Sequence, residues 1–348
     1  MFPRSLQSKN PDGGPFGGWG DIFVFVLLLT LLSGCANVKK PIVNRRVASV
    51  EAINLIRSDQ LADLLGLSAR WIIAETRVAM DGAAGHLEIE SGRREAIASG
   101  VRIFLGEPVA VANGFLYVSR TDVERLLMPI FQGTGTRDIG SVRTIAVDAG
   151  HGGHDIGTTN RRMGLKEKDL TLEVAKELAT VLRRRGFVVI MTRAKDEFIP
   201  IEQRSRRARG ADLFISIHFN ATNSNKTSGT ETYILSAAGQ ASTGTHLPSS
   251  GDLASVSGNR WDESSAAFGF IVQTRLLEEF GTIDRGLKHA RFAVLRDLPC
   301  PGVLVESAFL SNDAEASRVA SKAFRSRLAE NLAGSVEAIA NLAGKWQL

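Results

Sequence analysis

The sequence predicts an α/β protein with a mostly parallel β-sheet and helices on both faces, preceded by a small α+β domain. After residue 142, continuous apolar runs alternate with helical segments, which is the pattern of a parallel sheet covered on both sides. Residues 49–131 instead show short strands separated by glycine turns, which is typical of hairpins. The 348 residues are enough for two such cores.

The larger domain, residues 143–345, is predicted from an alternation of elements. Its expected strands are residues 143–150, 187–193, 212–220, 229–235, 292–296 and 301–310. Its expected helices are residues 168–186, 199–211, 262–280 and a closing helix over 313–344. Residues 236–263 are rich in Ser and Gly and lack helical periodicity, so they predict a mobile rim or substrate loop.

The small domain, residues 49–131, is expected to begin as a strand that turns helical over residues 52–67. Hairpin strands follow, and then a helix capped by Ser119 or Thr121. Residues 132–142, which are rich in Gly and Thr, predict a linker between the two domains.

The N-terminal residues 1–34 are predicted to be a signal peptide. Residues 22–32 form an 11-residue apolar run, which is too short to span a bilayer as a helix but fits a signal sequence. The run leads into Leu32-Ser33-Gly34-Cys35, which resembles a bacterial lipobox. This resemblance implies cleavage before Cys35 and attachment of lipid to its thiol. The alternative is a buried N-terminal helix with an incidental thiol.

The basic, aperiodic residues 35–48 would then tether the protein to a membrane. Ala36 follows the cysteine, and it is not the aspartate that often retains lipoproteins at the inner membrane. We therefore expect a lipid-anchored protein of the cell envelope, at the outer membrane.

Charge and cysteine content argue against a nucleic-acid-binding protein and against a disulfide-stabilised protein. The formal net charge of +5 and the pI of 9.4 are mild, and apolar residues make up 44% of the chain. The arginine-rich stretches at 183–185 and 204–209 fall at helical spacing without interleaved aromatic residues, so we expect no nucleic-acid binding. Cys35 and Cys300 are the two cysteines, which argues against a disulfide framework.

Polar side chains stand at the ends of three predicted strands. They are His151, His218 and Glu306, and Glu167 comes just before the first predicted helix. Because the carboxyl ends of parallel strands share one edge of a sheet, these residues would lie together. Two histidines and one carboxylate are the ligand set of a catalytic zinc site with one position open. Glycines around His151 would let the backbone approach a metal closely.

Each residue also has a simpler interpretation. His218 alone fits a hydrogen-bonded core imidazole, and Glu167 fits a carboxylate that a helix N-terminus stabilises. Glu306 is harder to explain in this way, because a carboxylate in so apolar a strand is costly unless it is paired or used.

Residues 144–342 resemble the zinc-dependent N-acetylmuramoyl-L-alanine amidases of bacterial cell-wall remodelling. The resemblance rests on stretches in the family's order: IAVDAGHGGHDIG, GLKEKDLTLEVAKELATVLRRRGFVVIMTR, RSRRARGADLFISIHFNA, GTETYIL and RGLKHARFAVLRDLPCPGVLVESAFLSN. It implies that His151, Glu167 and His218 bind Zn²⁺, that Glu306 is catalytic and that Asn220 orients the site loop. The chain departs from the family pattern at Ala149 and Ala308, where the family usually has Pro and Gly.

The resemblance also implies the reaction, which is hydrolysis of the amide between N-acetylmuramic acid and L-alanine in peptidoglycan. The biological role would be cell-wall remodelling or daughter-cell separation, with peptidoglycan as the partner. Two alternatives stay open: a non-catalytic peptidoglycan-binding lipoprotein, and a zinc peptidase that acts on the stem peptide. Some relatives need a protein activator, and the sequence leaves open whether this chain does.

Residues 49–131 resemble the small repeat at the N-terminus of copper amine oxidases. They carry no cluster of metal-ligating side chains, so we interpret them as a spacer or binding module.

Overall fold

The computed structural model describes residues 54–137 and 139–345. The predicted signal peptide, Cys35 and the tether over residues 35–48 lie outside these residues. In the described part of the chain, no helix is both long and apolar enough to cross a bilayer.

The strands and helices alternate as the sequence predicts for most of the chain after residue 142. The strands are β1 (Leu55–Arg57), β2 (Ser68–Ile73), β3 (Arg77–Gly82), β4 (Gly85–Glu90), β5 (Glu95–Ala98), β6 (Val101–Phe104), β7 (Ala110–Ala112), β8 (Phe115–Ser119), β9 (Thr144–Ala149), β10 (Thr159–Asn160), β11 (Leu165–Lys166), β12 (Val188–Met191), β13 (Leu213–Asn220), β14 (Thr230–Ile234), β15 (Asp284–His289) and β16 (Gly302–Phe309). The α-helices are α1 (Ser58–Leu65), α2 (Arg120–Asp122), α3 (Met128–Gln132), α4 (Glu167–Arg184), α5 (Ile201–Arg207), α6 (Ser250–Leu253), α7 (Asp262–Phe280), α8 (Ala293–Arg296), α9 (Asp313–Ala320) and α10 (Lys322–Gly344).

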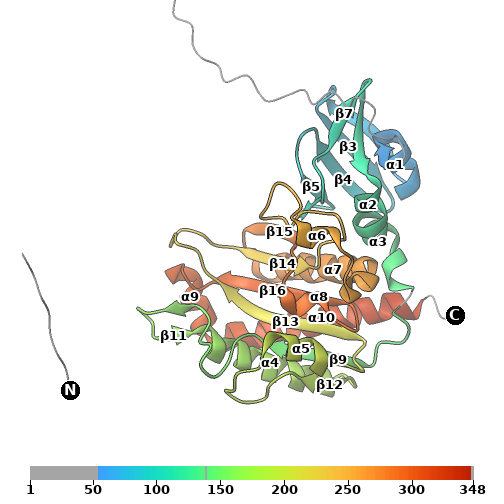
Figure 1. Cartoon of the computed structure of the whole chain (residues 1–348). Helices are drawn as coiled ribbons and strands as arrows, with labels where there is room; N and C mark the ends of the chain where they lie inside the picture. Colours follow the sequence, from blue (N-terminus) through green and yellow to red (C-terminus); the bar gives the residue numbers. More distant parts are fainter. Residues whose placement is uncertain (1–53, 138, 346–348) are drawn as a thin grey trace, which may run out of the picture. The chain divides into compact units, whose positions relative to one another are not determined.

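The main sheet of the described residues has 11 strands in the order β12-β9-β13-β16-β14-β15-β6-β5-β4-β3-β2 (Figure 1). Strands β12, β9, β13 and β16 are all parallel, as expected for this part of the chain. Strand β14 runs antiparallel to β16 and parallel to β15, so the sheet is mixed. The α/β prediction is confirmed.

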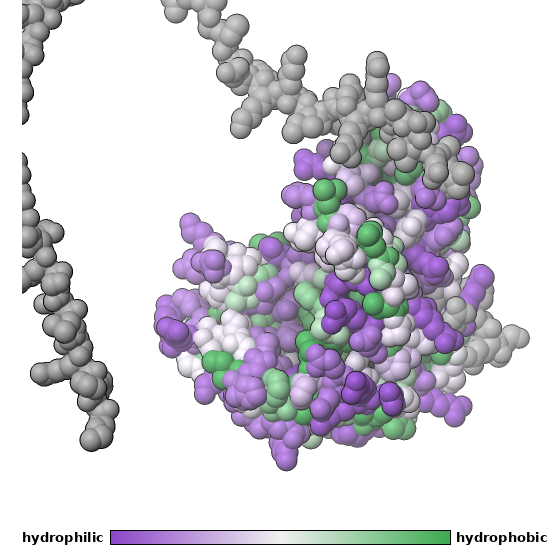
Figure 2. Space-filling view, in the orientation of Figure 1, coloured by the Kyte–Doolittle hydropathy of each residue, from purple (hydrophilic) through white to green (hydrophobic). Residues whose placement is uncertain are grey.

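Helices cover both faces of the parallel strands because their side chains alternate between two cores. On one face, Ile145 and Val147 of β9 pack into a large core with residues of α4, α7 and α10. On the other face, Ala146 joins a smaller core with Val294 and Leu295 of α8. Apolar residues appear only as scattered patches among hydrophilic ones on the surface drawn in Figure 2.

Residues 54–131, here called the small domain, continue the sheet of the larger domain. Strand β6 pairs in parallel with β15, with Ile103 opposite Leu287. A separate sheet of the small domain has the order β1-β8-β7. The predicted cap is Ser119, whose Oγ accepts a hydrogen bond from the backbone N–H of Asp122 at 3.1 Å.

Two expectations after residue 230 are wrong. The apolar run at 292–296 forms the short helix α8, and the strand of this region is β15, which precedes it. A short apolar run does not distinguish a strand from a buried helix. The closing helix is two helices, α9 and α10, because Ser321 is extended (φ −71°, ψ 125°).

The mobile rim or substrate loop expected over residues 236–263 stays a prediction, but the first part of this segment packs against the small domain. Ala237, Gln240 and Ala241 are buried. Gln240 donates a hydrogen bond to Asp122 at 3.0 Å, and Arg94 donates to the carbonyl of Ala241 at 2.8 Å.

Candidate metal centre and active site

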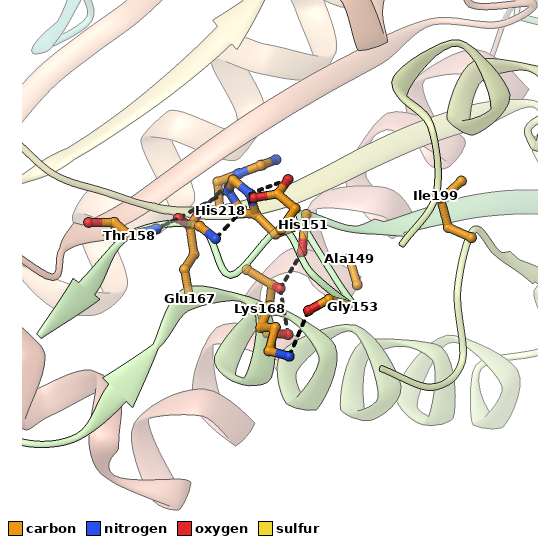
Figure 3. Close-up of polar contacts among 12 residues, drawn as sticks. Ala149, His151, Gly153, Thr158, Glu167, Lys168, Ile199 and His218 are labelled. Atoms are coloured by element: carbon orange, nitrogen blue, oxygen red, sulfur yellow. Dashed lines mark hydrogen bonds and ion pairs between the residues drawn. The ribbon is translucent and has the colours of Figure 1, made fainter. Parts of the chain in front are cut away.

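The structure brings the three predicted metal ligands together at one edge of the sheet (Figure 3). His151 follows β9, His218 lies in β13, and Glu167 is the first residue of α4. One ligand atom from each residue lies within 4.8 Å of the others. Glu167 Oε2 is 3.0 Å from His151 Nε2, and Oε1 is 3.0 Å from His218 Nδ1.

The strand register explains this convergence. Strands β9, β13 and β16 are parallel neighbours, so their carboxyl ends meet at the same edge. Ile217 pairs with Ala149, and His218 pairs with Glu306. Residues far apart in sequence are thus placed side by side by the sheet itself.

Glycines make room for the ligands, as the sequence suggested. A Cβ at Gly150 would collide with the ring of His218, and a Cβ at Gly157 would lie 2.6 Å from Glu167 Oε2. His151 itself has a positive φ of 60°, which is uncommon for a residue with a side chain. The loop therefore holds His151 in a strained conformation that turns its ring toward Glu167.

Glu167 is buried but held in its charged form. Its carboxylate accepts hydrogen bonds from the backbone N–H groups of Thr158 (2.8 Å) and Phe219 (3.1 Å). Burial favours the neutral acid, but hydrogen bonds from His151 and His218 outweigh it and hold the pKa of Glu167 well below its usual value. An ionised carboxylate between two imidazoles is ready to bind a cation.

Asp155 is a site residue that sequence reasoning missed. Its Oδ2 and Oδ1 lie 2.9 and 3.0 Å from His151 Nδ1, so the other ring nitrogen, Nε2, faces Glu167. Burial works against the imidazolium, but Glu167 and Asp155 together raise the pKa of His151. A carboxylate on the second nitrogen is the usual way to orient a metal-binding histidine. The signal was present as an aspartate four residues after His151.

Two buried arginines fix the loop that carries His151. Arg204 donates to the carbonyl of His151 at 2.7 Å and to Asp148 Oδ1 at 2.9 Å. Arg193 is 1% exposed and donates to the carbonyls of Ala149 (2.9 Å) and Gly150 (2.8 Å). These contacts hold the loop without reaching the candidate metal centre, so both arginines have a structural role.

Glu306 lies in the same cavity, and its charge is not compensated by a direct contact. Its Oε2 is buried and has no hydrogen-bond partner. Burial, together with the negative charges of Glu167 and Glu231, raises the pKa of Glu306 well above its usual value. A buried carboxyl group with a free oxygen can accept or donate a proton.

Asn220 does not contact the three predicted ligands directly in the contacts described for it. Its Nδ2 donates to Glu231 Oε1 at 2.6 Å, and its Oδ1 accepts from the N–H of Ala221 at 2.7 Å. The structure thus places Asn220 beside Glu231, a buried residue of β14 that sequence reasoning also missed. The signal was a carboxylate inside a predicted strand, as for Glu306.

A cavity of about 720 Å³ contains the candidate centre. Its lining includes His151, Glu167, His218 and Glu306, and residues from 198–204, 218–221 and 292–294. The apolar side chains of Phe198, Ile201 and Phe292 are about 40% exposed along it (41%, 42% and 39%). Among the described residues of 236–263, none lines this cavity.

The profile of the N-acetylmuramoyl-L-alanine amidase family matches residues 145–338. N-acetylmuramoyl-L-alanine amidase AmiC of Neisseria meningitidis is 35% identical over 223 residues, which cover 57% of this chain and 52% of that protein. N-acetylmuramoyl-L-alanine amidase LytC of Bacillus subtilis is 33% identical over 189 residues, which cover 54% of this chain and 33% of LytC.

Solved structures also match. The catalytic domain of CwlV, an N-acetylmuramoyl-L-alanine amidase from Paenibacillus polymyxa, is 27% identical with a TM-score of 0.48, and the match covers 58% of this chain and 99% of that domain. The matches to AmiC and LytC extend over only about half and a third of those proteins. Because the family profile covers more than half of the sequence, the chain belongs to the N-acetylmuramoyl-L-alanine amidase family.

Proposed function

We propose that this protein is a zinc-dependent hydrolase that cleaves the amide between the lactyl group of N-acetylmuramic acid and L-alanine in peptidoglycan. The observation that carries the proposal is the convergence of His151, Glu167 and His218 in one cavity with Glu306, whose Oε2 has no partner. Family membership supplies the substrate class.

The donor set fits zinc. Two imidazole nitrogens and one carboxylate oxygen are common ligands of a catalytic zinc site with one open position. His151, Glu167 and His218 would hold the ion, and Asp155 would orient His151. Zinc at this position would supply Lewis acidity, which polarises an amide carbonyl and acidifies a water molecule.

Glu306 would carry the proton in the reaction. Its free Oε2 takes a proton from the attacking water and then returns it to the nitrogen of the departing amine. One carboxyl group thus acts as general base and then as general acid. The apolar side chains of Phe198, Ile201 and Phe292 would hold the substrate against the centre and exclude water.

The test is mass spectrometry of purified peptidoglycan digested with the full chain. We expect free stem peptides that begin with L-alanine, together with glycan strands that lack stems. Stems shortened from within would instead identify a peptidase, and unchanged muropeptides would identify a binding protein. Either result would contradict the proposed function.

The proposal extends to the layout of the chain. Residues 143–345 would form the catalytic domain, and lipid on Cys35 with a tether over residues 35–48 would hold it at a membrane of the cell envelope. Cys35→Ser should move the protein from the membrane fraction to the soluble fraction without a change in amidase activity. Retention of Cys35→Ser in the membrane fraction would contradict the anchor.

A further inference from the structure

We propose that the small domain is a positioning element for the active site, which acts through Phe104 and Lys288 on the buried carboxylate of Glu231. This inference rests on the proposed function, and it gives the small domain a role beyond that of the spacer or binding module expected from the sequence. A chain of contacts leads from β6 through Lys288 and Glu231 to Glu306.

The two domains share one sheet, and they join where β15 pairs with β6. Strand β15 lies between β14 of the larger domain and β6 of the small domain. Leu287 pairs with Ile103, and Nε2 of the buried His289 is 3.0 Å from the carbonyl oxygen of Phe104. Because β15 is bordered by the small domain on one side, the position of Lys288, between Leu287 and His289, depends on both domains.

The second step is the environment of Lys288. Its side chain is 13% exposed, and its Nζ lies 5.8 Å from the ring centroid of Phe104 and 5.6 Å from that of Tyr233. A glycine makes room for the Phe104 ring, since a Cβ at Gly286 would lie 2.9 Å from Phe104 Cε2. Phe104 thus shields the ammonium group of Lys288 from water and offers it the face of an aromatic ring.

The third step is the ion pair that Lys288 makes. Its Nζ contacts Glu231 Oε2, which also accepts a hydrogen bond from Arg285 Nε at 3.1 Å. Glu231 is 2% exposed, so its charge must be compensated by these cations. Shielding by Phe104 strengthens the pair, because the attraction between charges grows as water is excluded.

The last step connects Glu231 to the candidate active site. Glu231 pairs with Glu306 across β14 and β16, and its Oε1 accepts a hydrogen bond from Asn220, two residues beyond His218. A Glu231 carboxylate that is fixed by Lys288 therefore fixes the strand ends that carry His218 and Glu306.

A second contact ties the small domain to the same region. The Arg94 guanidinium donates to the carbonyls of Ala241 (2.8 Å) and Thr245 (2.7 Å), in the segment that follows β14. Thr243 Oγ1 accepts a hydrogen bond from the N–H of His289 at 3.0 Å. The small domain thus holds both β15 and the segment after β14.

The experiment compares Phe104→Ala, Phe104→Leu and a control, Phe115→Ala, in the full chain. Phe115 is also an aromatic residue of the small domain with a cation over its ring (Arg57, 4.3 Å), but it lies in the β1-β8-β7 sheet. We expect Phe104→Ala to lower kcat about 10-fold with KM within twofold of wild type and zinc content unchanged. Phe104→Leu should restore most of kcat, and Phe115→Ala should keep it within twofold.

Wild-type kcat in Phe104→Ala, or an equal loss in Phe115→Ala, would overturn the proposal. A measurement that does not depend on amidase activity is the Tm of Phe104→Ala, Lys288→Met and the double variant. We expect the double variant to lose less Tm than the sum of the two single losses, because both changes remove the same contact. Additive losses would overturn the Phe104–Lys288 contact, whereas absence of amidase activity in the wild type would overturn the proposed function alone.

Discussion

Two buried carboxylates lie opposite each other on β14 and β16, and their surroundings differ. Glu231 is held by Asn220 and Tyr233 at Oε1 and by Arg285 and Lys288 at Oε2. Glu306, its register partner, has a buried Oε2 without a partner. A paired buried carboxylate stabilises a fold, whereas an unpaired one can accept or donate a proton, which is the role proposed above for Glu306.

The cations around Glu231 also explain how the charge of Glu306 is controlled. Lys288 is the nearby positive charge that lowers the pKa of Glu306, whereas burial, Glu167 and Glu231 raise it. The ion pair of Glu231 with Lys288 therefore contributes to the pKa of Glu306.

The largest effect is expected for Glu306→Gln. The amide keeps the size of the side chain but cannot accept a proton from water, so kcat should fall by about 10³-fold or more. The Tm should stay at or above the wild-type value, because a neutral amide replaces a carboxyl group whose Oε2 is buried without a partner. Steady-state kinetics and calorimetry check both expectations. Substantial activity in Glu306→Gln would contradict the role of Glu306.

Glu231→Gln should lower kcat at least as much as Phe104→Ala does, and unlike Glu306→Gln it should also lower stability. It leaves Lys288 and Arg285 without their buried counter-charge, which costs about 3 kcal/mol of unfolding free energy. Denaturant unfolding measures this loss. Glu330→Gln is the matched control, since the side chain of Glu330 is 47% exposed and pairs with Arg184 and Arg185. The control should lose less than about 1 kcal/mol. Equal losses of unfolding free energy in Glu231→Gln and Glu330→Gln would contradict the special role of the buried ion pair.

Asp155→Asn should weaken metal binding by about 10- to 100-fold, because His151 loses the carboxylate that orients its ring. Competition with a chelator measures this affinity. Asp196→Asn is a control, since the side chain of Asp196 is 47% exposed and bonds to Lys168 and Gly153 rather than to a predicted ligand. Unchanged affinity in Asp155→Asn would show that Asp155 does not orient His151.

The smallest effect is expected for the pH dependence of stability, which arises from His289 at the junction of the two domains. Burial, with Arg94 nearby, lowers the pKa of His289 from its usual 6.5 to about 4. The folded state thus holds His289 neutral, while the unfolded chain takes up a proton as the pH falls through 6.5. Its contribution to stability is therefore full above pH 6.5 and is lost as the pH falls toward 4, by about 1 kcal/mol between pH 6 and pH 5.

His289→Gln tests this expectation, because the amide can still donate to the carbonyl of Phe104 but does not titrate. Denaturant unfolding at several pH values should give a flatter pH profile for the variant than for the wild type. Parallel profiles would contradict the burial of a neutral His289 at the junction.

The sequence was informative where local patterns decide the structure. Apolar runs predicted β9, β13 and β16, and the rule for parallel strands placed His151, His218 and Glu306 at one edge. Strand β15 was missed because its sequence, DRGLKH, has no apolar run and is stabilised by neighbours on both sides. The continuous sheet across the small domain was not foreseen, because pairing between Ile103 and Leu287 is a long-range contact.

The site was only partly predictable for a related reason. Ligand types and their strand positions could be read from the sequence, but the partners that orient them could not. Asp155 and Glu231 were visible as carboxylates near the motifs, yet only the folded structure places them on His151 Nδ1 and Asn220 Nδ2.

The most direct test of the account is the zinc content of three purified proteins, measured by mass spectrometry of the metal. The wild type and Glu306→Gln should each bind one zinc ion per chain, and His218→Ala should bind none at the same free-metal concentration. Equal zinc in His218→Ala and wild type, or loss of zinc in Glu306→Gln, would contradict the separation between residues that hold the metal and the residue that moves the proton.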